Sequence, residues 1–588
     1  MASHRLTALL ATAALAAIGA APAHAGPAHD QVDRIVARTL DSIAAAKTAS
    51  GAFTDPVKGS VGGAGLPQLG FPALKASQIT GGNSSWDAIA AATFARGVGG
   101  TKLITMWPAA VTWSTGAGAR LPEAQRRRLA QALSSAGKLH ASGIADVCFQ
   151  RRASGCFNNY VVMSELMNLE LWATGLKPSG PSSRLSDRAI VSHSLSRLMS
   201  RTAAHASSGY VVGRDGQALP TELISDPSTY PLAYQALTTA MVVRGADIAA
   251  RVRPLSWQTR ARITRLLRSL LITVAPTGEV AWMGRGQDTA WSLAAVLYAA
   301  SAGQRLTGDT TLRRQLSQLA AIELTALETR SKGDRFLQVR PDNATPAGFD
   351  HYASAIGNAS LAMTFLQLAR PDLGNLAPAG GGTPATTPGT HAYDPGSHVL
   401  TARSKWGWMG IHTVASHKTD PRYDFGLLRA LAQNEDGSWV QLMPARPITD
   451  GKAALTSAPT IQGVRPVVTR VDASGDTAYV IARWRGQSAR FTWKVENGRA
   501  IMQGTCPAGQ SVAMTAWLPI VGELGTTDRT LTRAGYSIAA DRPITYNRYR
   551  SGASSREAAL GAYSLRYRCG ARKSVFRFAF SGTEPARG

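Results

Sequence analysis

Apolar residues recur at helical spacing through the first 375 residues of the chain. In residues 30–47, Val32, Ile35, Val36, Leu40 and Ile43 would share one face of a helix. Similar stripes occupy residues 122–140, 159–174, 186–204, 232–250, 257–274, 288–302, 312–329 and 351–368. The segments between them are rich in Gly, Pro and Ser, which interrupt helices. We therefore expect at least nine helices.

The pattern changes after residue 376. Residues 377–396 consist mainly of Gly, Pro, Thr and Ala, a composition typical of a linker. Beyond them, residues 477–485, 488–496, 499–505 and 575–580 alternate with period two or are β-rich, and Asn497-Gly498 is a strong two-residue hairpin signal. We predict an incomplete (α/α) toroid over residues 26–376, a linker over 377–396 and an antiparallel β-sandwich over 397–588, with a central cleft lined by loops and helix ends.

The first 25 residues are typical of a secretory signal. His4 and Arg5 precede an apolar run, and Ala23-His24-Ala25 offers the small residues that signal peptidase requires before Gly26. No later stretch approaches 18 consecutive apolar residues, so we expect no membrane span. The mature protein is predicted to be secreted, extracellular or periplasmic, after cleavage near Ala25.

Four cysteines stand at positions 148, 156, 506 and 569. An even number in an oxidising compartment suggests two disulfides, Cys148 with Cys156 and Cys506 with Cys569. A metal site is the less favoured interpretation, because the sequence has no Cys-x-x-Cys and no histidine at ligand spacing.

The chain is strongly basic. Its 63 Lys and Arg against 37 Asp and Glu give a formal charge of +26. Such a surface attracts polyanions. Export and the lack of a base-reading motif argue against nucleic acid and in favour of an acidic polysaccharide. The oligomeric state is left open.

Three segments carry polar residues at expected helix starts or in loops. Asn158, Asn159 and Tyr160 follow the predicted Cys148–Cys156 loop, although Asn158 could simply cap the helix. The second segment contains Arg214, Glu222, Tyr230 and Tyr234, and either tyrosine could equally be a core residue. The third contains Trp282, Arg285 between two glycines, and Gln287.

Arg285 in a glycine-flanked loop could grip a carboxylate, or it could be a surface residue paired with Asp288. His351 opens the last long helix, where Asp350 as N-cap is the simpler interpretation. Exposed tryptophans could act as platforms for sugar rings or could belong to the core; the candidates are Trp86, Trp107, Trp113 and Trp282.

Two of these segments resemble a known family. The Asn158-Asn159-Tyr160 helix start is similar to the Asn-Asn-His segment of alginate lyases and heparinase-like polysaccharide lyases. The run Asp215-Gly216-Gln217 to Glu222-Leu223 and the following tyrosine resembles the Asp-Gly-Ser to Glu-Leu-x-Arg and tyrosine segment of the same families. The segment 406–433 resembles the start of the sandwich that they share with hyaluronate and chondroitin lyases.

The resemblance implies β-elimination on a uronic-acid polysaccharide without metal or organic cofactor. Asn159 and Arg285 would neutralise the carboxylate, and Tyr230 or Tyr234 would act as base and acid. The chain departs from the family pattern at Tyr160, where the family has His, and at Ser225, where it has Arg. Arg285, Arg214 or His351 would then take over those roles.

Two alternatives stay open. A toroid glycoside hydrolase would need two carboxylates, and the candidates are Glu165, Glu222, Asp226, Asp288 and Asp350. A non-catalytic secreted protein that binds polyanions would leave the polymer intact.

Overall fold

The computed structural model describes residues 27–48, 52–55, 66–95, 103–142, 158–172, 176, 187–226, 229–286, 289–331, 355–374, 376, 383–414, 421–444, 459–474, 477–484, 486–554 and 559–583. The predicted signal peptide and the predicted Cys148–Cys156 pair lie outside these residues. No helix in the described part of the chain is both long and apolar enough to cross a membrane.

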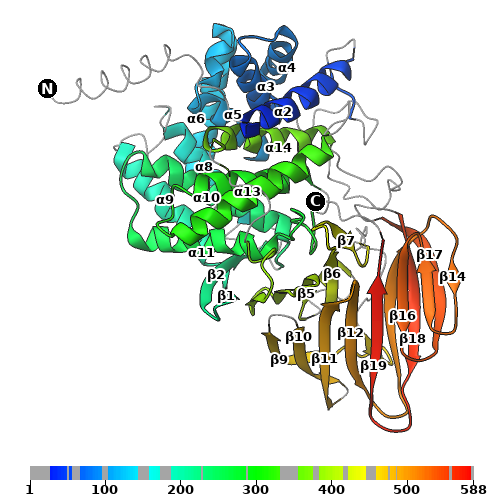
Figure 1. The fold of residues 1–588 in the computed structure, drawn as a ribbon. Helices are drawn as coiled ribbons and strands as arrows, with labels where there is room; N and C mark the ends of the chain where they lie inside the picture. The colour runs from blue at the N-terminus through cyan, green and yellow to red at the C-terminus, as the bar shows by residue number, and fades with distance from the viewer. Residues whose placement is uncertain are drawn as a thin grey trace.

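Twelve α-helices are described in the first 370 residues (Figure 1). They are α2 (Pro27–Ala45), α3 (Leu66–Ile79), α4 (Ser84–Ala95), α5 (Leu103–Ser114), α6 (Glu123–Ser142), α8 (Asn158–Trp172), α9 (Asp187–Ala203), α10 (Leu232–Ala250), α11 (Trp257–Thr273), α12 (Ala290–Gly303), α13 (Thr310–Arg330) and α14 (Ala355–Ala369). Each of the nine predicted helices has a counterpart among them.

Three helices were missed by the sequence analysis because they lack a simple helical stripe. Helices α3 and α5 contain Pro72 and Pro108, which normally argue against a helix interior. Helix α4 has apolar residues around its circumference rather than on one face.

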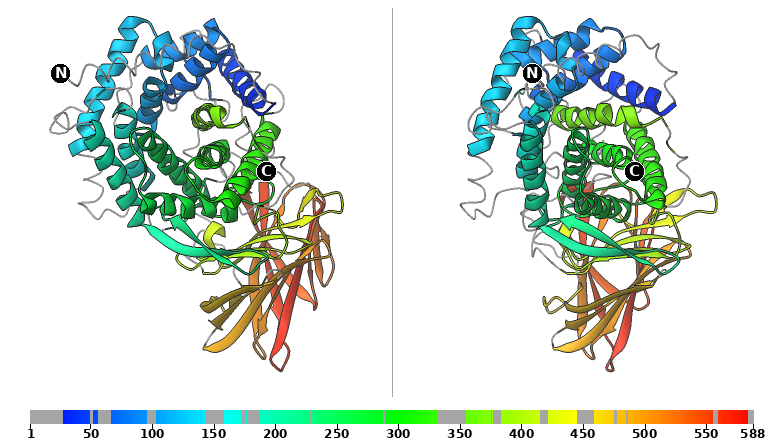
Figure 2. Two further views of the ribbon diagram at one scale, coloured as in Figure 1. Left: turned by 60° about the vertical axis from the view of Figure 1, so that its left-hand side comes forward. Right: turned by 90° about the vertical axis from the view of Figure 1, so that its left-hand side faces the viewer.

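The helices form an open ring, which is clearest in the left view of Figure 2. Helices α10, α12 and α14 are buried on almost every face, whereas α11 and α13 keep one polar side. Small residues allow close helix packing: a Cβ at Gly303 of α12 would come within 2.6 Å of Leu267 of α11. Side chains cap some helices, since Ser256 accepts from Thr259 N and Asp309 accepts from Leu312 N.

The strands in the described part of the chain are antiparallel and form three sheets. They are β1 (Ala206–Val212), β2 (Ala218–Ile224), β3 (Thr390–Asp394), β4 (Val399–Arg403), β5 (Gly407–His412), β6 (Gly426–Gln433), β7 (Trp439–Gln441), β8 (Thr460–Ile461), β9 (Val467–Ser474), β10 (Thr477–Trp484), β11 (Gln487–Glu496), β12 (Arg499–Cys506), β13 (Ser511–Pro519), β14 (Gly525–Thr526), β15 (Thr530–Arg533), β16 (Tyr536–Ala540), β17 (Ile544–Ser554), β18 (Ala559–Arg568) and β19 (Ser574–Ser581).

The sheet orders are β2-β1-β3-β4-β5-β6-β7, β14-β15-β16-β19-β12-β11-β10-β9 and β17-β18-β13-β8. Asn497 and Gly498 both have positive φ, 49° and 67°, in the turn that joins β11 to β12, so the predicted hairpin is confirmed. The predicted fold class, a helical toroid followed by an antiparallel β-sandwich, is also confirmed.

The seven-stranded sheet is shared between the two domains. The β1–β2 hairpin, which was not predicted, leaves the helical region and pairs with β3 through Tyr210 opposite Tyr393 and Val212 opposite His391. Strand β3 lies within residues 377–396, so five residues of the predicted linker are part of a sheet.

An apolar cluster fills the space between the helical ring and this sheet. It joins Leu232 of α10 and Trp282 to Leu223, Trp408 and Leu431 of the sheet. The indole rings of Trp282 and Trp408 meet edge to face with their centroids 5.6 Å apart. This shared core fixes the position of the loops that carry the candidate site.

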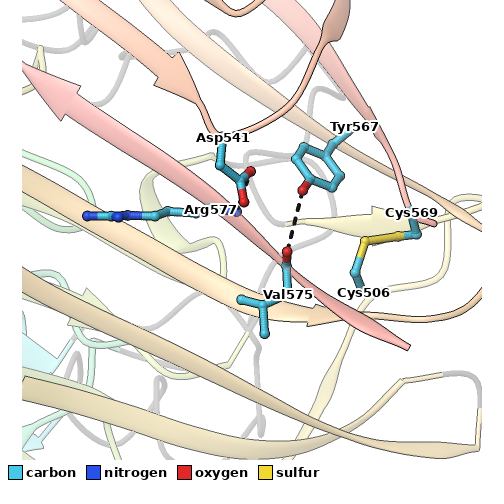
Figure 3. The surroundings of a disulfide bond; sticks show 6 residues. All are labelled: Cys506, Asp541, Tyr567, Cys569, Val575 and Arg577. Carbon is cyan, nitrogen blue, oxygen red and sulfur yellow. Dashed lines mark hydrogen bonds between the residues drawn. A yellow bond between two sulfur atoms is a disulfide. The ribbon is translucent and has the colours of Figure 1, made fainter. Parts of the chain in front are cut away.

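The disulfide between Cys506 and Cys569 is present, as predicted (Figure 3). It connects the end of β12 to the residue after β18 and so joins the eight-stranded sheet to the four-stranded sheet. Beside it, the Tyr567 hydroxyl donates to the Val575 carbonyl at 3.4 Å. Burial and the neighbouring carboxylate of Asp541 raise the pKa of Tyr567 to about 12.

Candidate functional site

The loop that carries Arg285 is shaped by two glycines. Gly284 and Gly286 have φ values of 86° and 82°, which only glycine adopts without strain. A Cβ at Gly284 would lie 2.7 Å from the Cα of Pro231, so the loop lies directly against the start of α10. The backbone therefore holds Arg285 beside the segment that contains both candidate tyrosines.

The Arg285 side chain is held by Asp226. Asp288, the partner considered from the sequence, lies outside the described residues. Its Nη2 donates to the Asp226 carbonyl at 3.1 Å and to Asp226 Oδ2 at 3.2 Å. The Asp226 carboxylate is 3% exposed and the Arg285 side chain 22% exposed. A partly exposed guanidinium is thus anchored on a buried acid.

Tyr234 lies next to this guanidinium. The Arg285 Cζ is 5.2 Å from the centroid of the Tyr234 ring, within the range of a cation–π contact. The ring also meets Trp291 edge to face, with centroids 5.4 Å apart. Because Tyr234 is in the first turn of α10, helix and loop together fix the phenol and the guanidinium as a pair.

Tyr230 has different surroundings. Burial, followed by the charge of Asp394, raises the pKa of Tyr230, and hydrogen bonds with Ser207 and Ser225 oppose this only in part. Asp394 is fully buried and accepts from Ser207 Oγ at 2.8 Å. The phenol of Tyr230 therefore stays protonated near neutral pH.

The sheet domain also contributes to the site. The Tyr423 hydroxyl, 3% exposed, accepts from the backbone N–H of Arg285 at 3.1 Å and lies 3.5 Å from Thr229 Oγ1. Burial raises the pKa of Tyr423. The sequence analysis did not single out Tyr423 as a site residue, although it lies in the segment identified as the start of the sandwich.

Two histidines of the sheet were also missed. His412, at the end of β5, is 2% exposed, and burial, then the neighbouring His398, lower its pKa to about 3. His398 has a left-handed φ of 60° and its ring centroid lies 6.2 Å from that of His412. Burial also lowers the pKa of His398, so both imidazoles favour the neutral form.

Two predicted substrate-binding residues have structural contacts instead. Glu222 is buried and forms ion pairs with Arg262 at 2.6 Å and Arg265 at 3.1 Å, which attach β2 to α11. Trp282 is 1% exposed, and its indole N–H donates to the Thr273 carbonyl at 2.7 Å. We therefore leave both out of the proposed site, Trp282 because no sugar can reach its face.

Arg214 lies away from the other candidates. It is exposed at the turn between β1 and β2, whereas Asp226 follows the opposite end of that hairpin. Seven paired residues at about 3.3 Å each separate the two ends by roughly 20 Å. Arg214 therefore does not join Arg285 at one carboxylate. Of the other candidate platforms, Trp86 and Trp107 are also buried.

The side chains of the remaining candidates lie outside the described part of the structure. Helix α8 begins at Asn158, one residue before the predicted stripe, and packs against α10. The side chains of Asn158, Asn159 and Tyr160 are among those outside the described part. Gln287 and His351 fall wholly outside the described residues, as do Cys148 and Cys156.

The described carboxylates suggested for a hydrolase are each held by arginine. Glu165 pairs with Arg197 at 2.6 Å, Glu222 with Arg262, and Asp226 with Arg285. Burial raises the pKa of Glu165 despite its partner. Among the described residues no group of three His, Cys, Asp or Glu side chains is arranged to hold a metal ion.

Comparisons with known proteins give structural neighbours of low sequence identity. No protein-family model matches the chain, and no curated protein matches it in sequence. A heparinase III aligns over 88% of this chain and 77% of its own, at 10% identity and a TM-score of 0.46. A chondroitin AC lyase mutant from Streptomyces coelicolor A3 aligns over 96% and 80%, at 11% identity and 0.46.

An α-1,6-mannanase from Salegentibacter sp. HEL1_6 aligns over 57% of this chain and 99% of its own, at 10% identity and a TM-score of 0.37. The neighbours thus include polysaccharide lyases of the type that the sequence resembles, and also a hydrolase. Since the TM-scores of these neighbours are below 0.5, the function below is argued from the residues of this chain.

Proposed function

We propose that the chain is a secreted polysaccharide lyase that cleaves a uronic-acid polysaccharide by β-elimination. The observation that carries the proposal is the pairing of Arg285 with Tyr234, 5.2 Å apart, at the junction of the two domains. The pair places a cation for a substrate carboxylate beside a phenol that can exchange a proton.

The chemistry requires both groups. The C5 proton of a uronate is weakly acidic because its loss builds negative charge onto a carboxylate that is already anionic. A fixed guanidinium stabilises that charge as it develops. Arg285 is fixed by Asp226 and by Tyr423, so little reorganisation is needed. We propose Asn159, at the start of α8, as a second donor to the carboxylate.

We propose Tyr234, rather than Tyr230, as the base. A base needs its ionised form to be favoured, and a nearby cation does this. Arg285 lies over the Tyr234 ring, whereas Tyr230 is near Asp394, whose charge opposes ionisation.

The proposed step balances without water or cofactor. The phenolate of Tyr234 takes the C5 proton, the electron pair of that C–H bond forms a C4–C5 double bond, and the C4–O4 bond breaks. The same phenol then gives the proton to the bridging oxygen, which departs as the anomeric hydroxyl of the leaving sugar. The products are an unsaturated uronate and a new free end.

Export forms part of the proposal. The charged start, the apolar run and Ala23-His24-Ala25 support a cleaved signal, and the Cys506–Cys569 disulfide suits an oxidising compartment. Expression in a secretion-competent host and N-terminal sequencing of the protein from the medium or periplasm test this. We expect the exported protein to begin at Gly26. A protein that stays in the cytoplasm with residues 1–25 attached contradicts the proposal.

The activity is tested by incubation with alginate, glucuronan, hyaluronan, chondroitin and heparin. A lyase produces ultraviolet absorbance from the new double bond, together with shorter chains. Shorter chains without absorbance would identify a hydrolase, and binding without cleavage of any polymer would identify a non-catalytic binding protein.

A further inference from the structure

The eight-stranded sheet has one face in the sandwich core and one face that no described helix covers (Figure 1). Side chains alternate along its strands: Val480, Phe491 and Trp493 are fully buried, whereas their neighbours in sequence are partly or fully exposed. We call the exposed side the outer sheet face. Its charged residues are Arg470, Asp472, Arg483, Arg490, Lys494, Glu496, Arg499 and Arg577.

Cross-strand register places polar groups of this face in a continuous row. The row runs across five strands through Asp472, Tyr479, Thr492, Gln503 and Arg577. With strands about 4.8 Å apart, it extends over roughly 19 Å. A row of this length suits an extended polymer rather than a single small ion.

One cation of the face is held in a fixed orientation. The Arg490 Cζ lies 4.3 Å above the centroid of the Tyr479 ring, and the Tyr479 hydroxyl donates to Asp472 Oδ2 at 2.6 Å. Such stacking holds a guanidinium flat, with its N–H groups directed outward along its edges. Less conformational entropy is then lost when Arg490 binds an anion.

Positive charge on the face exceeds negative charge. Asp472 pairs with Arg470 at 3.2 Å, and Glu496 pairs with Lys494 at 2.6 Å. Three further arginines, Arg483, Arg490 and Arg499, form no ion pair with any residue that the structure describes. These three are all exposed.

We propose that the outer sheet face binds a linear polysaccharide carrying carboxylate or sulfate groups, at a site separate from the Arg285–Tyr234 pair. The choice of polymer class rests on the proposed function. Nucleic acid fits less well, because Arg490 covers the Tyr479 ring that an unstacked base would need. The face would hold the substrate polymer while the junction site cleaves it.

The test compares two double variants of the full chain that remove the same charge. The first is Arg483→Gln with Arg490→Gln on the outer sheet face. The control is Arg566→Gln with Arg568→Gln, two exposed arginines of β18 in the four-stranded sheet. Binding to heparin, alginate, neutral dextran and duplex DNA is measured by titration at several salt concentrations.

For the first variant we expect the affinity for heparin and alginate to fall about tenfold at low salt. The slope of log affinity against log salt concentration should become shallower by about 2. The control variant should bind within about twofold of the unmodified chain. Equal losses in both variants would overturn the proposal, since net charge alone would explain binding. Equal binding of dextran would also overturn it, and tighter binding of DNA than of either acidic polysaccharide would assign the face to nucleic acid.

The result is independent of catalysis. A substrate oligosaccharide can be chosen that is too short to reach both sites. Its turnover should be unchanged by the Arg483→Gln and Arg490→Gln pair. If no polymer is cleaved but binding depends on the outer sheet face, the lyase proposal fails and the binding site stands. If cleavage occurs but neither variant changes binding, the binding site fails alone.

Discussion

Glu279 of the helical domain and Arg429 of β6 form a fully buried ion pair, with Arg429 Nε 2.7 Å from Glu279 Oε2. Their side chains are 1% and 0% exposed, and the Arg429 guanidinium also donates to the Met443 carbonyl at 3.0 Å. The pair connects the turn after α11 to β6, which lies between β5 and β7 in the shared sheet. A single contact thus ties together the two sides of the junction that carries the candidate site.

Breaking this pair from one side should destabilise the protein strongly. We expect Glu279→Leu or Arg429→Leu to lower the free energy of unfolding by about 3 to 5 kcal/mol, because a buried charge loses its partner. The double substitution should recover much of that loss. Denaturant unfolding measures this, and a single variant as stable as the unmodified chain contradicts it.

Removal of the Tyr234 hydroxyl should abolish the proposed reaction. We expect Tyr234→Phe to lower kcat about 10²- to 10⁴-fold with little change in substrate binding, because the proton acceptor is lost. Tyr230→Phe, the matched control, should keep activity within about threefold. Initial rates of ultraviolet absorbance check both, and the opposite ranking would assign the base to Tyr230.

The charge and the shape of Arg285 can be tested separately. Arg285→Lys keeps the cation but loses the planar fork that meets Asp226, so we expect kcat to fall about tenfold or more. Arg285→Ala should cost about 10²- to 10³-fold, in the range of a lost charge-stabilising donor. Tyr423→Phe removes the acceptor for the Arg285 N–H, together with the contact to Thr229 Oγ1, and should cause a smaller loss than either. Equal activity in all three variants rules Arg285 out as the cation.

Stability should depend on pH through His412. Its folded pKa, about 3, lies well below the ordinary value of a histidine, so the unfolded chain binds a proton that the folded chain excludes. Stability is therefore full above about pH 6.5 and is lost progressively as the pH falls toward 3. Unfolding free energies at pH 7 and pH 5 should differ less in His412→Gln than in the unmodified chain. An equal difference in both proteins excludes this group as the cause.

The Cys506–Cys569 disulfide closes a loop with a sequence separation of 63. By chain entropy, such a cross-link contributes about 4 kcal/mol to stability. We expect the double substitution Cys506→Ser and Cys569→Ser to lower the thermal midpoint clearly, measured by calorimetry without reductant. An unchanged midpoint would mean that the sheets hold this end of the sandwich without the cross-link.

Local patterns in the sequence were sufficient for much of the fold. The stripe beginning at Val32 and the Asn497-Gly498 turn are encoded by residues near one another in the chain, and both predictions are confirmed. The β1–β2 hairpin is different, because β1 is stabilised by pairing with β3, about 180 residues later in the chain. Short-range patterns carry no information on such pairing.

In the candidate site, too, local features could be predicted from the sequence and contacts between distant segments could not. Two glycines in the sequence correctly indicated that Arg285 lies in a tight loop. Its contacts with Asp226 and Tyr423 depend on segments 59 and 138 residues away, so no spacing rule could identify them. The contacts of Glu222 could not be predicted for a related reason, since its arginine partners lie on α11, some 40 residues further along the chain.

The sharing of one sheet by both domains has a consequence for expressing them separately. A fragment ending near residue 376 would carry the β1–β2 hairpin with the hydrogen-bonding edge of β1 open, and a fragment beginning there would expose β3 in the same way. Unprotected strand edges pair with other chains. Each half alone should therefore self-associate, whereas the two co-expressed halves should reassemble along that seam into a nicked, full-sized molecule.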